Sequence, residues 1–333
     1  MPVDGRVNVG LHLDLRNPRP WRQDPARLHA FTLELAEEAD RLGAHSIWLS
    51  EHHRAEDDYL ASPLTFASAI AARTKKVRIG TAIMVAPLHH PVEIAEQAAL
   101  VDLVSDGRLD LGLGAGYRLS EYELFGETLE RKYSKTDERV RQIRRLWEDG
   151  GVTPRPVQSP PPIWLGYQGP QGARRAGLLG EGLLCADGRL WEPYRDGLLE
   201  AGHDLGRARM AGSVQGWVSD DPEKDWPTVS RHLAYQLGSY AEYALEGSGR
   251  APRPIDTDAL RQRDADGLKY FWCETPETMA QRVRGMIGDS PTRTVFFWAS
   301  LAGMPEDWAA RHVQTLCEKL APLLAGPTGT NED

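Results

Sequence analysis

The chain has few cysteines, no long apolar run and no excess of positive charge. Its three cysteines are odd in number and far apart, which argues against a disulfide framework or a cysteine zinc site and predicts free thiols in a reducing cytoplasm. No run of about 18 apolar residues exists and the start lacks a signal-peptide pattern, so no membrane association is predicted. The net charge of −9, from 39 basic and 48 acidic residues, argues against nucleic-acid binding.

A glycine-rich dinucleotide-binding motif is also missing. The nearest candidate is 112–116, where glycine occupies every second position, but the following Tyr117–Ser120 does not supply the third glycine of Gly-x-Gly-x-x-Gly. Glycines at a strand end also let the backbone approach a flat ligand or a neighbouring strand. The sequence therefore argues against a doubly wound open sheet.

Short apolar runs alternate with amphipathic segments along the chain. Strands are predicted at 7–13, 46–50, 77–85, 109–113, 163–165, 183–185, 212–218 and 294–298. Helices are predicted at 25–42, 63–73, 91–104, 134–147, 171–179, 190–200, 276–287 and 308–320, with Ser134 and Asp137 as a capping box. This alternation predicts one (β/α)₈ barrel domain over 1–333, with insertions at about 117–161 after strand four and 219–274 after strand seven.

Polar residues gather where the predicted strands end, and in this fold the chemistry lies at those carboxyl ends. They are His12 after the first strand, Glu51, His52 and His53 after the second, His89 and His90 after the third, 114–118 after the fourth and 166–169 after the fifth. Histidine titrates near neutral pH and suits proton transfer. His52 and His53 point to opposite sides of an extended chain and no His-x-His follows the first strand, so no metal is predicted.

The stretch 46–126 resembles the bacterial luciferase family of flavin-dependent monooxygenases. The motifs are Glu51-His52-His53, Gly80-Thr81-Ala82, His90-Pro91 with Glu96-Gln97, LVSDGRL at 103–109, Phe125-Gly126, PIWLG at 162–166 and Thr275-Pro276-Glu277. Any one of these is weak, but their order and spacing over roughly residues 7–322 are specific.

The resemblance implies an FMN-dependent monooxygenase. It would be the oxygenase component of a two-component system, in which a separate reductase supplies reduced FMN and dioxygen then serves to oxidise a small organic substrate. It also implies a homodimer that pairs through the alanine-rich helices 63–73 and 91–104. One alternative is a deazaflavin-dependent hydride-transfer oxidoreductase, although such relatives often have Asp-His at the position of Glu51-His52. The other is a non-catalytic flavin-binding protein.

The resemblance also implies which residues form the site. A non-prolyl cis peptide, here Ala82–Ile83, would support the flavin at the barrel mouth, and His52 would act in the reaction of reduced flavin with dioxygen. The predicted catalytic residues are His52, Glu51, His53 and His12. The predicted cofactor-binding residues are Glu51, Ala82, Ile83, Gly114, Ala115, Tyr117, Gly166, Gln168 and Gln171. The predicted substrate residues are His90 and, on one helical face of 231–243, His232, Tyr235 and Tyr243.

The flavin phosphate is where the chain departs from the luciferase pattern. The reactive cysteine of luciferase corresponds to Gly114, and the phosphate-contacting arginine beside it corresponds to Ala115. The phosphate would then be held by backbone N–H groups at the start of the helix after strand five. Gln168, Gln171, Arg174 or Arg175 would assist.

Overall fold

The computed structural model describes residues 5–266 and 269–326, and its main sheet is a closed barrel of parallel strands. The barrel strands are β1 Asn8–Leu13, β2 Ser46–Leu49, β3 Arg78–Thr81, β4 Met84–Val85, β5 Leu109–Gly114, β6 Ile163–Leu165, β7 Gly182–Leu184, β8 Met210–Ser213 and β11 Thr292–Trp298. They follow the order β3-β2-β1-β11-β8-β7-β6-β5-β4, and pairing of β3 with β5 closes the ring. Because β3 and β4 are two parts of one interrupted strand, the barrel has eight strands and the predicted (β/α)₈ fold is confirmed.

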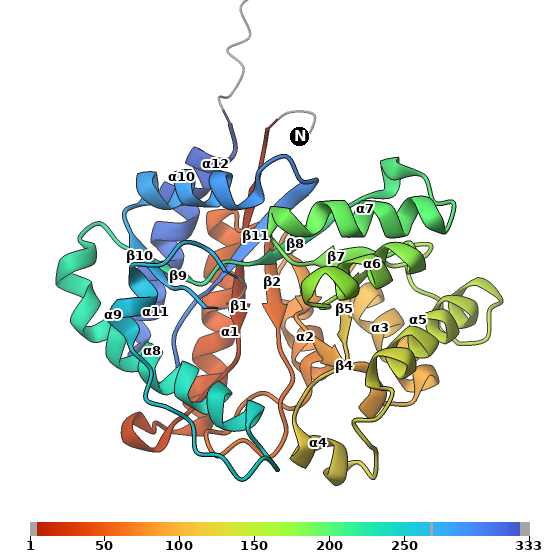
Figure 1. Cartoon of the computed structure of the whole chain (residues 1–333), viewed down its shortest axis with the longest axis horizontal. Coiled ribbons are helices and arrows are strands. Elements are labelled where there is room, and N and C mark those ends of the chain that lie inside the picture. Colours follow the sequence, from red (N-terminus) through yellow and green to blue (C-terminus); the bar gives the residue numbers. More distant parts are fainter. Residues whose placement is uncertain (1–4, 267–268, 327–333) are drawn as a thin grey trace, which may run out of the picture.

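Helices surround the barrel (Figure 1). They are α1 Pro25–Leu42, α2 Pro63–Arg73, α3 Pro91–Ser105, α5 Lys132–Glu148, α6 Gly169–Leu179, α7 Trp191–Glu200, α10 Pro276–Ile287, α11 Glu306–Thr315 and α12 Ala321–Leu324. The end signals explain the bounds of α1: Asp24 accepts a hydrogen bond from the Arg27 N–H, and Gly43 ends the helix at φ 83°. Thr275 caps α10 in the same way.

Side chains alternate between the two faces of the barrel strands. In β2, Ile47 and Leu49 join the apolar core that includes the surrounding helices. Trp48 between them has its ring stacked on Phe296 at 5.1 Å and edge-on to Trp164 at 6.1 Å. The barrel is therefore filled with aromatic side chains and is not a channel.

The predicted strand 77–85 is interrupted. The Ala82–Ile83 peptide bond is cis, as predicted, and it separates β3 from β4. Neighbouring backbone comes very close at this point, because a Cβ atom on Gly112 would lie 1.7 Å from the Thr81 carbonyl oxygen. Glycine at 112 thus serves the close approach of two strands.

The first insertion differs from prediction at two points. A short helix, α4 (Leu119–Leu124), precedes α5 and was not predicted. The predicted capping box of Ser134 and Asp137 is wrong, because α5 begins at Lys132 after a left-handed Arg131. Asp137 instead accepts a hydrogen bond from the Tyr167 hydroxyl at 2.6 Å.

The second insertion begins earlier than predicted and carries a long helix. The predicted strand 212–218 is divided into β8 and β9 (Gly216–Val218), and β9 pairs with β10 (Trp272–Glu274) in a separate two-stranded sheet. Between them lie α8 (Pro222–Ala244) and α9 (Thr257–Arg261). In Figure 1, α4 and the end of α8 lie beside the carboxyl ends of the barrel strands.

Two further expectations concern the whole chain. All three cysteines are free thiols. Within residues 5–266 and 269–326, no helix has the length and apolar character needed to cross a membrane.

Candidate active site

Glu51 is a buried carboxylate, 2% exposed, that is fixed from three directions. Its Oε1 lies 2.8 Å from His53 Nε2 and 2.6 Å from His89 Nε2, and its Oε2 accepts the Val85 N–H at 2.5 Å. Burial alone would raise the pKa of Glu51, but the hydrogen bonds from His53 and His89 outweigh it and the pKa is lowered. Glu51 is therefore a charged residue held by the barrel.

The strand pattern predicted that His89 lies at the barrel mouth, but His89 was not among the predicted catalytic, cofactor-binding or substrate residues. Burial lowers the pKa of His89, but the hydrogen bond and the negative charge of Glu51 together raise it by more, so the net shift is upward. One ligand atom each of Glu51, His53 and His89 lie within 4.8 Å of one another, an arrangement that could hold a metal ion. Both imidazoles already hydrogen-bond to the same Glu51 oxygen, so the cluster does not need an ion to explain it.

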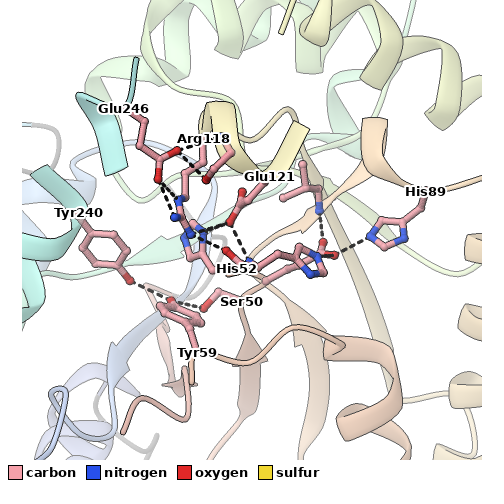
Figure 2. A network of polar contacts seen from close by, with 12 residues as sticks. Ser50, His52, Tyr59, His89, Arg118, Glu121, Tyr240 and Glu246 are labelled. Atoms are coloured by element: carbon pink, nitrogen blue, oxygen red, sulfur yellow. Dashed lines mark hydrogen bonds and ion pairs between the residues drawn. The ribbon is translucent and has the colours of Figure 1, made fainter. Parts of the chain in front are cut away.

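His52 is held by a different carboxylate, Glu121 of α4, which is 1% exposed (Figure 2). Glu121 Oε1 lies 2.8 Å from His52 Nδ1 and also accepts the His53 N–H at 2.9 Å and Arg118 Nη1 at 3.2 Å. The amide and the guanidinium can only donate, so this oxygen is an acceptor. His52 Nδ1 therefore carries a proton, and in neutral His52 the lone pair is left on Nε2.

Arg118 joins this carboxylate to the second insertion. Its guanidinium donates to the His53 carbonyl at 2.7 Å and pairs with Glu246 at 2.6 Å. The N–H and hydroxyl of Ser120 donate to the other Glu246 oxygen at 3.1 and 2.8 Å. The guanidinium also lies 3.7 Å from the centre of the Tyr243 ring at the end of α8. The site of His52 thus includes residues from both insertions.

A chain of hydroxyl groups leads from His12 to α8. His12 Nε2 lies 2.9 Å from Ser50 Oγ, Ser50 Oγ lies 2.7 Å from the Tyr59 hydroxyl, and that hydroxyl lies 2.9 Å from the Tyr240 hydroxyl. Burial and the nearby His52 lower the pKa of His12 to about 4, so His12 is neutral at pH 7. Burial raises the pKa of Tyr59, which remains a neutral phenol.

The residues predicted to contact a cofactor follow the ends of β2, β3, β5 and β6, with Gln171 in the first turn of α6. Ala82 and Ile83 are half-buried, whereas the residues on either side of them are buried. A Cβ atom on Gly114 or Gly166 would lie 2.7 or 2.4 Å from the Ile83 side chain, so both glycines let Ile83 pack against bare backbone. Tyr117 is exposed with its ring edge-on to His52 at 5.8 Å. Ala115 is buried, and Gln168 and Gln171 are exposed at the start of α6.

The predicted substrate residues do not gather in one place. His90 is exposed and caps α3, where its Nδ1 accepts the Val92 N–H at 3.3 Å. The rings of His232 and Tyr235 contact Trp21 at 4.2 and 5.9 Å. Only Tyr243 lies beside a predicted catalytic residue, with its ring 5.7 Å from that of His52.

Several residues of the site were missed by the sequence analysis. They are Ser50, Tyr59, Glu121, Tyr240 and Glu246, whereas Arg118 was placed at the end of the fourth strand but was not selected as a site residue. Ser50 and Tyr59 lie close to the Glu-His-His motif and could have been suspected from that. Glu121 and Glu246 are 69 and 194 positions beyond His52, and no spacing in the sequence marks them.

Residues 12–291 match the family described as luciferase-like monooxygenase. The oxygenase component of flavin-dependent trigonelline monooxygenase from Acinetobacter baylyi is 34% identical over 165 residues, which are 45% of this chain and 46% of that protein. The F420-dependent glucose-6-phosphate dehydrogenase of Kineococcus radiotolerans is 32% identical over 79% of this chain and 85% of that protein. The match to the trigonelline enzyme thus spans about half of its length.

A solved structure agrees with the sequence relatives. Monooxygenase RslO1 from Streptomyces bottropensis superposes with a TM-score of 0.75 at 26% identity, over 95% of this chain and 99% of that chain. Its fold and the long sequence match extend over both the barrel and the segments that carry Glu51 and Glu121. The chain belongs to the luciferase-like monooxygenase family.

Proposed function

We propose that this protein is the oxygenase component of a two-component monooxygenase that uses reduced FMN and dioxygen to oxidise a small organic substrate. The observation that carries the proposal is the His52–Glu121 pair, with His52 Nδ1 fixed at 2.8 Å and Nε2 free to exchange a proton. Family membership supports an oxidoreductase. The name of the Acinetobacter relative, an oxygenase component, supports a separate reductase as partner.

The residues at the barrel mouth fit a flat, largely apolar ring system. Ala82 and Ile83 form a half-exposed apolar surface. The Ile83 side chain packs against the backbone of Gly114 and Gly166, which have no side chains. Ala82, Ile83 and Tyr117 would hold the flavin ring, and Glu51 fixes the backbone beside them through the Val85 N–H. When bound, reduced FMN would supply the electrons that activate dioxygen.

The side chains around the flavin ring would have different parts in proton transfer. His52 holds or moves a proton at Nε2, and Glu121 keeps the other nitrogen protonated and stabilises the imidazolium. His12, whose pKa is about 4, is a poor proton donor at neutral pH. Tyr59 and Tyr240 can pass a proton between His12 and α8 through the chain of hydroxyls. The contacts of Arg118 hold the insertions over this region and limit the access of water.

Anaerobic titration with reduced FMN, followed by stopped-flow mixing with dioxygen, tests the proposal. The protein should bind reduced FMN, and bound FMN should be oxidised at a rate clearly different from that of free FMN. A wild-type protein that does not bind reduced FMN, or that leaves its oxygen reaction unchanged, would overturn the proposal. The second result would favour a non-catalytic flavin-binding protein.

A deazaflavin-dependent hydride transfer is the second candidate. The 32% identity to the Kineococcus F420-dependent dehydrogenase over most of both chains favours it. The same titration performed with F420 separates the two candidates. Tight binding of F420 together with weak binding of FMN would replace the monooxygenase proposal.

We also infer a homodimer formed through α2 and α3. Leu100, Leu103 and Val104 near the end of α3 are 51%, 39% and 44% exposed, which is a large apolar exposure for one helix. Pairing of two copies through this face would bury them. Sedimentation should give a dimer at micromolar concentration, and Leu100→Asp should shift it toward monomer. A monomeric wild-type protein would contradict the inference.

A further inference from the structure

A small cavity lies beside the barrel mouth, between the end of β1, helix α1 and the segment that leads from β11 to α11. Its lining includes the buried residues His12, Asp14 and Arg16, and also Gln23 and Glu306, which are half-buried. The cavity therefore extends from the interior toward the surface. Its volume is about 40 Å³, and because a single water molecule needs about 10–15 Å³ of such space, the cavity has room for more than one.

Asp14 is a carboxyl group of this cavity that is only weakly neutralised. Its side chain is buried, and its contact with the Gln236 amide of α8 is long, with Nε2 3.5 Å from Asp14 Oδ2. The charge of Arg16 acts on Asp14, but the Arg16 guanidinium is itself buried and already pairs with Asp57 at 2.6 Å. Two buried carboxyl groups thus share one guanidinium. Because a buried negative charge without a full counter-charge is unfavourable, Asp14 can be neutralised by taking up a proton.

The pKa values near the cavity distinguish Asp14 from its neighbours. Burial raises the pKa of Asp14 to about 7, a shift that the charge of Arg16 opposes and the charge of Asp57 reinforces. By contrast, burial lowers the pKa of His12 to about 4 and raises the pKa of Tyr59 well above its usual value. Of these three groups, Asp14 is the one that can gain and lose a proton near neutral pH.

Asp14 lies against both segments that carry the tyrosines of the hydroxyl chain. Its carbonyl oxygen accepts the Leu60 N–H at 3.2 Å, which holds it beside the segment of Tyr59. Gln236 precedes Tyr240 by one turn of α8. Burial, together with the charge of Asp14, raises the pKa of each tyrosine, so both hydroxyls lie within reach of that charge. The cavity thus adjoins the chain of hydroxyl groups.

We propose that Asp14 exchanges protons between water in this cavity and the hydroxyl chain, so that the cavity serves as a proton inlet to the active site. This inference rests on the proposed flavin-dependent function, because converting one oxygen atom of dioxygen into water requires two electrons and two protons. Each group in the chain would accept a proton on one side and pass on its own proton on the other. One proton moves in net, and no group of the chain is consumed.

Three proteins test the proposal: wild type, Asp14→Asn and the matched control Asp58→Asn, which has the same change at an exposed position. For each, the affinity for reduced FMN and the rate at which dioxygen oxidises the bound FMN are measured from about pH 5 to about pH 9. We expect Asp14→Asn to slow this reaction about tenfold with unchanged FMN affinity, and to remove a change of rate that wild type shows near pH 7. Asp14→Glu should restore part of the rate, and Asp58→Asn should behave as wild type.

Urea denaturation tests the titration of Asp14 without any flavin. Because the pKa of Asp14 is raised in the folded protein, its contribution to folding stability is complete below about pH 4 and is lost as the pH rises through about 7. The midpoint of wild type relative to that of Asp14→Asn should therefore fall between about pH 5 and about pH 8. The other charged and titratable groups that face Asp14 or its cavity are the same in both proteins: Arg16, Asp57, Tyr59, Tyr240, His12 and Glu306.

A folded Asp14→Asn protein that keeps the pH profile of wild type would overturn the proton inlet and leave the flavin-dependent function standing. A relative urea midpoint that does not change with pH would also overturn the inlet, because Asp14 would then not titrate in this range. A wild type that does not bind reduced FMN, or that leaves its reaction with dioxygen unchanged, would remove the proposed function and this inference together.

Discussion

His52 and His53 are neighbours in the sequence, but the structure anchors them in different parts of the molecule. The His53 imidazole contacts Glu51, whose other partners, His89 and Val85, belong to the barrel side of the site. The His52 imidazole contacts Glu121 of the first insertion, which is joined through Arg118 to Glu246 of the second. Figure 2 shows Glu121 beside His52, with Arg118 and Glu246 next to them and His89 further away.

The two neighbouring histidines of the Glu51-His52-His53 motif therefore belong to two separate clusters with different roles. The Glu51 cluster is complete within the barrel and stabilises the chain around β4. The Glu121 cluster depends on contacts between segments that are far apart in sequence, and it leaves His52 Nε2 without a hydrogen-bond partner among the described residues. We therefore expect changes around Glu51 to alter stability first, and changes around Glu121 to alter turnover first.

Among the carboxylates, Glu121 should give the largest effect when it is replaced. Glu121→Gln keeps an oxygen that can accept the His53 N–H but removes the charge that stabilises a protonated His52. Turnover should fall about 10²-fold, while the affinity for reduced FMN changes little. A rate within twofold of wild type would show that Glu121 has no part in the chemistry.

Replacing Glu51 should act mainly on stability. Glu51→Gln removes the charge from hydrogen bonds to two imidazoles, and the free energy of unfolding should fall by roughly 2–3 kcal/mol. Urea denaturation should show a lower midpoint with an unchanged slope. The control is Glu96→Gln, the same change at an exposed position of α3, with an expected change within about 0.5 kcal/mol. Equal midpoints for the two variants would refute the structural role of Glu51.

The Glu51–His89 pair should also give a distinct pH dependence. Because the pKa of His89 is raised in the folded protein, protonated His89 contributes fully to folding stability below about pH 6.5. This contribution is lost as the pH rises through the raised pKa. Because the pKa of Glu51 is lowered in the folded protein, ionised Glu51 contributes fully to folding stability above about pH 4.5. This contribution is lost as the pH falls through the lowered pKa. The stability difference between wild type and His89→Gln should thus be larger at pH 6 than at pH 9. A stability difference between wild type and His89→Gln that is larger at pH 9 than at pH 6 would contradict this prediction.

Replacing Glu246 should give the smallest effect. Its side chain is partly exposed, so loss of its ion pair with Arg118 in Glu246→Gln should cost about 1 kcal/mol or less. Hydrogen exchange should become faster in α4 and at the end of α8, because this contact joins them. Unchanged exchange in both segments would mean that the two insertions are not coupled through Arg118.

Much of the fold follows from local signals in the sequence. Asp24 and Gly43 bound α1, and Thr275 caps α10, because capping depends only on neighbouring residues. The division of 77–85 did not follow from local signals, since most of that stretch is apolar and the prediction of its cis bond came from the family resemblance. The start of α5 at Lys132 was missed because a plausible local cap at Ser134 was not used by the structure.

The candidate site was predictable only where it follows the strands. Glu51, His52 and His53 directly follow β2, so their place at the barrel mouth came from the strand pattern. His89 could have been preferred to His90, because a residue directly before a helix-starting proline is the cap and faces solvent. Glu121 and Glu246 could not have been found, since tertiary packing alone brings them to His52.

The most direct test of the account compares His52→Ala with His53→Ala. For each folded variant, the affinity for reduced FMN, the melting temperature and the rate at which dioxygen oxidises the bound reduced FMN would be measured. We expect His52→Ala to slow this rate by at least about 10²-fold with nearly unchanged FMN affinity. We expect His53→Ala to keep the rate within about threefold and to lower the melting temperature. An unchanged rate in folded His52→Ala, or equal losses of rate in both variants, would contradict it.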